Sequence, residues 1–233
     1  MFNRSIIKEL EAWKNKEDRK PLIMLGARQV GKTSVLKRFG KEQFVHCAYF
    51  SLDEEKGVCD IFRTTKNPVQ IIEQLSFLSE VPILPQETLL ILDEIQDCPE
   101  AISAMKYFCE KTPEYAVACA GSLLGLAFGH EGFSFPVGKV DHIKMYPVTF
   151  TEFLEQKDAG LYRYYQSIND IEPLPQIFFD RLSQAFTAYR ISGGMPEAAM
   201  AMIGKDMKGV ENILQNILQD LSLIHISEPT RPY

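Results

Sequence analysis

A glycine-rich stretch near the N-terminus has the residue types and spacing of a phosphate-binding loop. Residues 26–33 read Gly-Ala-Arg-Gln-Val-Gly-Lys-Thr, which matches the pattern G-x-x-x-x-G-K-S/T. Its glycines allow backbone N–H groups to point inward and form a nest for a β-phosphate. The ammonium of Lys32 can reach the β- and γ-phosphates, and the hydroxyl of Thr33 can bind Mg²⁺. We therefore expect a nucleotide site at Gly26, Ala27, Arg28, Gln29, Val30, Gly31, Lys32, Thr33 and Ser34.

Further along the chain, an apolar run ends in two acidic residues. Residues 89–92 are Leu-Leu-Ile-Leu, and Asp93 and Glu94 follow them. A buried strand of this kind delivers both carboxylates to the carboxyl edge of a parallel sheet, where ligands bind. We expect Asp93 to hold the hydration shell of Mg²⁺ and Glu94 to orient, or take a proton from, the water that attacks the γ-phosphate. The alternative is an ordinary strand end followed by a solvated turn.

A serine after another apolar run is a candidate sensor of the γ-phosphate. Ser122 follows residues 115–121, and its hydroxyl could hydrogen-bond the attacking water or the phosphate; a simple Gly-Ser turn is the alternative. Hydrolysis also needs positive charge to meet the transition state. The bases that could supply it are Arg63, Lys139, Arg163, Arg181 and Arg190; spacing does not choose among them, and for each one taken alone a solvated or structural role is the favoured alternative.

Apolar runs alternate with helical periodicity over the first two thirds of the chain. Runs typical of a parallel sheet occur at residues 22–25, 47–52, 88–92, 115–120 and 140–146. Helical spacing occurs at residues 6–13, 34–39, 68–78 and 99–111. We expect Gly40 to end the second of these helices. This order predicts an α/β fold, a three-layer P-loop sandwich with a parallel central sheet.

From Thr149 the pattern is helical only. Thr149 and Glu152 form a capping box, and later helical stretches at residues 176–189 and 197–203 are separated by the Gly-Gly-Met-Pro of residues 193–196. The predicted organisation is an N-terminal helix, an ATPase core, and a helical segment that forms a lid and the start of a further domain. Their bounds are residues 1–20, 21–147 and 148–220.

Residues 221–233 fit nothing that precedes them. The amphipathic pattern before them stops without a C-cap glycine, and the tail looks like the translation of a transposase-type sequencing adaptor. We therefore expect this tail to be non-native and the natural chain to continue beyond Asp220; a genuine frayed C-terminus is the alternative. His225 lies in the tail and supports no functional assignment.

The composition argues against proteins that coat nucleic acid, bind metal through cysteines or span a membrane. Acids outnumber bases by 31 to 25, for a formal charge of −6, whereas proteins that coat nucleic acid usually show the opposite balance. No basic helix, finger or aromatic-basic interleaving indicates nucleic-acid recognition. The five cysteines lack the close spacing of metal knuckles or redox pairs. No apolar run is long enough for a membrane span, and no signal peptide is recognisable, so we expect a cytoplasmic protein.

Several motifs occur in an order that resembles a known family. They are Arg4, Trp13, Lys20-Pro21, the loop at 26–33, Leu-Asp-Glu-Ile-Gln at 92–96, Ala-Gly-Ser at 120–122, and residues 135–140, 145–154 and 193–196. Over residues 1–220 the chain looks like prokaryotic AAA-type ATP-binding proteins with a C-terminal domain of unknown function. The resemblance implies ATP and Mg²⁺, with catalytic roles for Lys32, Glu94 and Ser122 and metal binding by Thr33 and Asp93. Family members are usually longer, which agrees with a chain cut short.

The leading interpretation is an ATPase that couples hydrolysis through Walker A and Walker B motifs to a conformational change. The Asp93–Glu94 pair favours hydrolysis over a small-molecule kinase, and no Asn-Lys-x-Asp sequence indicates guanine recognition. The alternative is a nucleotide-dependent interaction switch or scaffold with slow turnover, which would use the same pocket. Both interpretations leave a protein partner unidentified and are compatible with an oligomer.

Overall fold

The computed structural model describes residues 2–122 and 136–227, with side chains described as far as Asp220. The chain divides into two compact units. The α/β unit spans Ser5–Tyr146, and the helical unit combines Met1–Arg4 with Pro147–Tyr233. Phe135 of the motif at 135–140 and residues 228–233 of the predicted tail lie outside the described residues.

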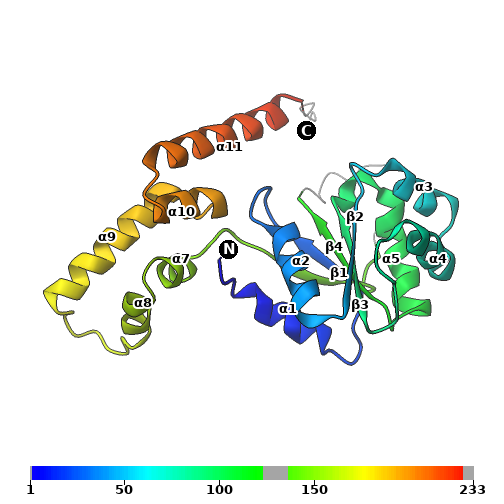
Figure 1. The fold of residues 1–233 in the computed structure, drawn as a ribbon, viewed down its shortest axis with the longest axis horizontal. Coiled ribbons are helices and arrows are strands. Elements are labelled where there is room, and N and C mark those ends of the chain that lie inside the picture. The colour runs from blue at the N-terminus through cyan, green and yellow to red at the C-terminus, as the bar shows by residue number, and fades with distance from the viewer. Residues whose placement is uncertain (1, 123–135, 228–233) are drawn as a thin grey trace. The chain divides into compact units, whose positions relative to one another are not determined.

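Within the described residues, five strands form one parallel sheet in the order β2-β3-β4-β1-β5 (Figure 1). The strands are β1 (Leu22–Leu25), β2 (His46–Ser51), β3 (Thr88–Asp93), β4 (Ala116–Gly121) and β5 (Asp141–Lys144). Every residue of β3 and β4 is buried, which explains their nearly continuous apolar sequences. Parallel neighbours require crossover connections, and helices provide them.

Helices cover both faces of this sheet (Figure 1). They are α1 (Ile6–Lys14), α2 (Lys32–Gln43), α3 (Lys56–Thr64), α4 (Pro68–Leu78) and α5 (Pro99–Lys111), with a short 3₁₀ helix, η1 (Ile95–Asp97), before α5. Successive strand residues point to opposite faces. Leu89 and Ile91 accordingly pack in a core with α1 and α2, whereas Leu90 and Leu92 pack in a second core with α3, α4 and α5. The predicted three-layer α/β fold is confirmed.

One predicted helix end is wrong. Gly40 does not close α2, which continues to Gln43. A Cβ at Gly40 would lie 2.5 Å from the Sγ of Cys47 and 3.2 Å from a methyl group of Leu89. Glycine is therefore present because the helix lies very close to the sheet at this point, and the local rule for helix ends does not register such packing.

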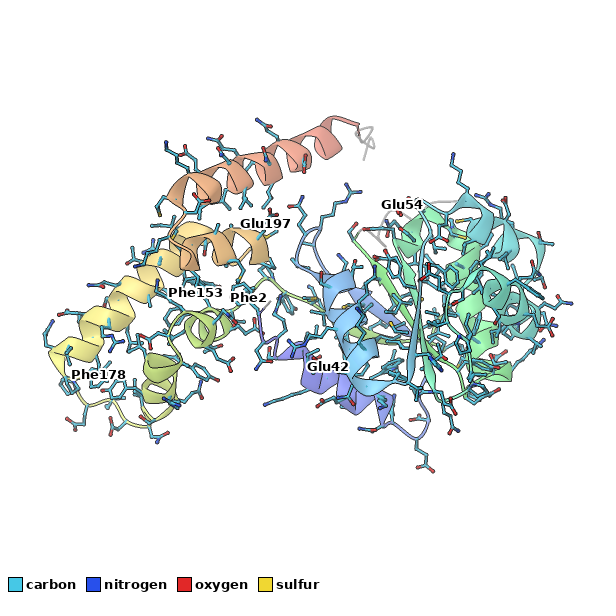
Figure 2. The ribbon with its side chains drawn as sticks, in the orientation of Figure 1. Phe2, Glu42, Glu54, Phe153, Phe178 and Glu197 are labelled. Carbon is cyan, nitrogen blue, oxygen red and sulfur yellow. The ribbon has the colours of Figure 1, made fainter. Side chains whose placement is uncertain are left out.

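The helical unit contains α7 (Phe150–Lys157), α8 (Ala159–Gln166), α9 (Gln176–Ser192), α10 (Pro196–Ile203) and α11 (Met207–Ser227). The predicted capping box is present: the Thr149 hydroxyl accepts from the N–H of Glu152, and the Glu152 carboxylate accepts from the N–H of Thr149. The same carboxylate forms a buried ion pair with Arg4, with Nε and Oε2 3.2 Å apart. Phe2 joins the core around Phe153 (Figure 2). Residues 2–4 are thereby fixed within the helical unit.

Sequence periodicity missed α3 and α8, which are both short. The backbone of α11 continues through Ser227, past Asp220. Over residues 2–122 and 136–227, no helix combines the length and the apolar character that a bilayer crossing requires.

Gly40→Ala should destabilise the protein. The added methyl overpacks the contact between α2 and the sheet, at a cost of about 1–3 kcal/mol, which exceeds the ~1 kcal/mol that alanine gains in helix propensity. Thermal unfolding followed by circular dichroism measures the change. Gly57→Ala in α3 is the matched control, because a Cβ there meets no atom within 4 Å; equal melting temperatures for the two variants would contradict the close packing.

Candidate nucleotide-binding site

The predicted site residues lie at the carboxyl ends of three adjacent strands, β3, β4 and β1. Strand β4 lies between β1 and β3, and the register pairs Leu25 of β1 with Gly121 and Leu92 of β3 with Cys119. The loop after β1, the acids after Leu92 and Ser122 after β4 therefore share one edge of the sheet. This is the edge at which parallel α/β sheets bind ligands.

Residues 26–31 connect β1 to α2 through an unusual backbone. Gln29 and Gly31 have left-handed φ values of 61° and 91°, and Gly31 is the N-cap of α2. Gly26 passes close to the end of β5, since a Cβ on it would lie 2.5 Å from the carbonyl oxygen of Met145. Changes of backbone handedness turn N–H groups toward a concavity that suits an anion. The N-terminus of α2 adds its partial positive charge at this place.

Lys32 begins α2 and folds back over the loop. Its Nζ donates to the carbonyl oxygens of Gly26 (3.0 Å) and Ala27 (2.8 Å), and the residue is 7% exposed. Burial lowers the pKa of Lys32, and the charges of Glu94 and Asp93 partly oppose that effect. The ammonium thus lies inside the loop on neutral acceptors.

Asp93 is the point where the loop meets the acidic strand. Its Oδ2 accepts from the hydroxyl of Thr33 at 2.6 Å and from the hydroxyl of Tyr49 at 3.1 Å, and its Oδ1 accepts from the N–H of Glu94 at 3.1 Å. Burial raises the pKa of Tyr49 to about 12, so the phenol is protonated and donates at neutral pH. Asp93 is 5% exposed, and these donors offset the loss of hydration.

Glu94 adopts a left-handed backbone (φ 49°) directly after β3. This conformation is uncommon for a residue with a Cβ. Its Oε2 accepts from the Nε2 of Gln96 at 2.6 Å, and the same amide nitrogen lies 3.1 Å from an oxygen of Asp97. The structure therefore fixes the Glu94 carboxylate through a neighbour two residues away. Sequence reasoning gave neither Gln96 nor Tyr49 a role, although Gln96 stands within the Leu-Asp-Glu-Ile-Gln motif.

Ser122 lies beside a basic residue of the loop. The Nε of Arg28 donates to the Ser122 hydroxyl over a long 3.4 Å. The sequence marked Arg28 only as part of the phosphate-binding backbone. Of the five bases proposed for the transition state, three form ion pairs elsewhere. These pairs are Arg63 with Asp60, Lys139 with Glu110 and Arg181 with Asp158.

A metal at this site would depend on the nucleotide for further ligands. Over the described parts of the chain, no group of three or more His, Cys, Asp or Glu side chains could hold a metal ion. Thr33 and Asp93 nevertheless offer a hydroxyl and a carboxylate 2.6 Å apart. Mg²⁺ is commonly bound by one or two protein oxygens together with phosphates and water, so this donor pair fits Mg²⁺.

Comparison with known families covers the whole candidate site. The model of a family described as an AAA domain matches residues 18–154, more than half of the chain. The chain belongs to the AAA domain family. The matched region of this AAA domain includes the loop, Asp93, Glu94 and Ser122. Family membership supports nucleotide binding.

No curated protein matches this AAA domain. Solved structures similar to it include C. elegans PCH-2, at 11% identity and TM-score 0.45, which covers 91% of this chain and 70% of that one. Drosophila ORC bound to DNA has 11% identity and TM-score 0.47, with 97% and 67% covered. The Thermotoga maritima RuvB Holliday junction branch migration motor has 16% identity and TM-score 0.47, with 91% and 64% covered. The sequence of this AAA domain offers no direct evidence for a nucleic-acid partner, and these similarities do not test that point.

Proposed function

We propose that this AAA domain binds ATP with Mg²⁺ and hydrolyses the bond between the β- and γ-phosphates. The observation that carries the proposal is the 2.6 Å hydrogen bond from Thr33 to Asp93. It brings the phosphate-binding loop and the acidic strand end, which are far apart in the sequence, to a single point. A nucleotide site needs both at one place, because phosphate binding and metal binding act on the same oxygens.

Binding follows from the charges of the loop. The ammonium of Lys32 donates to two neutral carbonyl oxygens, and exchange of these for phosphate oxygens would form stronger, charge-assisted hydrogen bonds. The N–H groups at the start of α2 would donate to the same phosphates. Thr33 and Asp93 would hold Mg²⁺, which when bound neutralises charge on the β- and γ-phosphate oxygens.

Glu94 is the proposed general base. Water attacks the γ-phosphorus, its proton passes to the Glu94 carboxylate, and the bond to the β-phosphate oxygen breaks to leave ADP and phosphate. The hydrogen bond from Gln96 supports the role by holding that carboxylate in place. Ser122 is the proposed contact to the γ-phosphate. Arg28, whose Nε donates to the Ser122 hydroxyl, is a proposed second loop cation that would meet developing negative charge together with Lys32.

The proposal includes a coupling of hydrolysis to a conformational change that a protein partner would read. An interaction switch or scaffold would use the same pocket and differ in turnover rate. Rapid turnover by the chain alone would favour the ATPase, and slow turnover stimulated by a partner would favour the switch.

Lys32→Ala should weaken binding of a fluorescent ATP analogue by about 10–100-fold, because a charge-assisted hydrogen bond contributes roughly 1.5–3 kcal/mol. Fluorescence anisotropy measures the dissociation constant. Lys41→Ala, at an exposed position of the same helix, is the matched control and should bind as the unaltered protein does. Unchanged binding by Lys32→Ala would refute the loop assignment.

Glu94→Gln should keep nucleotide affinity and lower the hydrolysis rate by about 10²–10⁴, the usual contribution of a general base. Release of phosphate under single-turnover conditions measures the chemical step. The control is Glu87→Gln, since Glu87 is an exposed residue just before the opposite end of β3. Equal rates for the unaltered protein and Glu94→Gln would remove Glu94 from the mechanism.

A further inference from the structure

Tyr49 occupies a position from which it can control Asp93. In the parallel register of β2 and β3, Tyr49 pairs with Ile91. Asp93 lies two residues beyond Ile91 and therefore on the same face of the sheet. Such diagonal neighbours are within reach of an aromatic side chain, and the Tyr49 hydroxyl lies 3.1 Å from Oδ2 of Asp93.

We propose that Tyr49 is a positioning residue that fixes the Asp93 carboxylate for the magnesium–nucleotide complex. The inference rests on the proposed function of the site and adds a contact from outside the two motifs. Its physical basis is the distribution of hydrogen bonds around Asp93, together with the different elements that supply the donors.

Each carboxylate oxygen can accept about two hydrogen bonds. Among the described residues, Oδ2 of Asp93 accepts from Thr33 and Tyr49, whereas Oδ1 accepts one N–H, from Glu94. Oδ2 is therefore fully used and the remaining capacity lies on Oδ1, the oxygen left to accept from metal-bound water. The two hydroxyl donors thus determine which oxygen of Asp93 is available.

Nucleotide binding would affect the two hydroxyl donors, Thr33 and Tyr49, differently. Thr33 belongs to the phosphate-binding loop and would itself contact the metal, so its geometry changes with occupancy. Tyr49 comes from β2, which pairs with β3 in the sheet. The ammonium of Lys37 also lies 3.2 Å from the centre of the Tyr49 ring, a cation–π contact that limits movement of the ring. The phenol is accordingly the donor that can hold Asp93 in place while the loop rearranges.

Tyr49→Phe removes the hydroxyl that donates to Asp93 and also interacts with Ser51, and it keeps the ring, its packing and the Lys37 contact. The experiment titrates Mg²⁺ against a fixed, subsaturating concentration of a fluorescent ATP analogue and repeats the binding measurement in EDTA. We expect the Mg²⁺ concentration for half-maximal enhancement of binding to rise by about tenfold, at the low end of the effect of losing an outer-shell partner of a metal ligand. Binding in EDTA should change by less than twofold.

Tyr115→Phe is the matched control. Tyr115 is a partly buried tyrosine just before the amino end of β4, the opposite end of the sheet from the site. Removal of the Tyr115 hydroxyl should leave the Mg²⁺ dependence of ATP-analogue binding unchanged. Combining Tyr49→Phe with Asp93→Ala gives a second readout, because removal of the Tyr49 hydroxyl should have no further effect on Mg²⁺ dependence once its acceptor is gone.

The outcomes separate this inference from the proposed function. An unchanged Mg²⁺ dependence in Tyr49→Phe, with binding still lost in Lys32→Ala, would overturn the role of Tyr49 and leave the nucleotide site intact. An equal loss of binding with and without Mg²⁺ would also overturn it, since that result indicates a general structural role. Absence of Mg²⁺-dependent binding in the unaltered protein would reject the proposed function, and the inference with it.

Discussion

The hydrogen bond between Thr33 and Asp93 joins the first turn of α2 to the end of β3. Helix α2 follows β1, and β4 lies between β1 and β3, so α2 must reach past β4 to make this contact. The register places Ala120 of β4 level with Met24 and next to Asp93. Ala116, Ala118 and Ala120 all point into the core that contains α2. Small side chains on this face let α2 lie close to the sheet, and its first turn can then reach Asp93. Gly40 makes the same close approach possible at the other end of the helix.

The site also holds two buried charged side chains of opposite sign. Lys32 and Asp93 are both almost fully buried, yet the hydrogen bonds of Lys32 go to neutral carbonyls and those of Asp93 come from hydroxyls and an N–H. Each charge is solvated by the protein and not by a direct ion pair with the other. Within residues 2–122 and 136–220 neither side chain forms a salt bridge, so the proposed anionic ligand of Lys32 and the proposed cation at Asp93 would have none to break there. The fold thus holds the Lys32 ammonium and the Asp93 carboxylate in one site without pairing them with each other.

The sequence could predict those helix and strand bounds that are set by residues close to them in the chain. The prolines that begin α4 and α5 and the apolar run before Gly26 depend on neighbouring residues alone, and the predicted bounds 68–78, 99–111 and 22–25 agree with the structure. The predicted strand at 88–92 is one residue short, because β3 includes Asp93. Gly40 was misjudged because its reason is tertiary: the close approach of Cys47. Tyr49 shows the same limit within the site. Its sequence context is that of any strand residue, and its partner Asp93 is defined only once β2 and β3 are paired in register.

The proposed coupling has a short path through the chain. The first residue of the loop, Gly26, packs against the carbonyl of Met145, and the N–H of Met145 donates to Leu25 at 2.7 Å. Two residues later, Pro147 begins the main part of the helical unit. A shift of the loop on binding phosphate would press directly on the segment that connects the two units, because a contact without room for a methyl group transmits displacement and does not absorb it. Arg4 and Glu152 fix the other connection, since their buried ion pair keeps residues 2–4 in the helical unit while α1 belongs to the α/β unit. Two covalent links, one beside the phosphate-binding loop and one beside α1, are thus available to transmit a change at the nucleotide to the helices that follow.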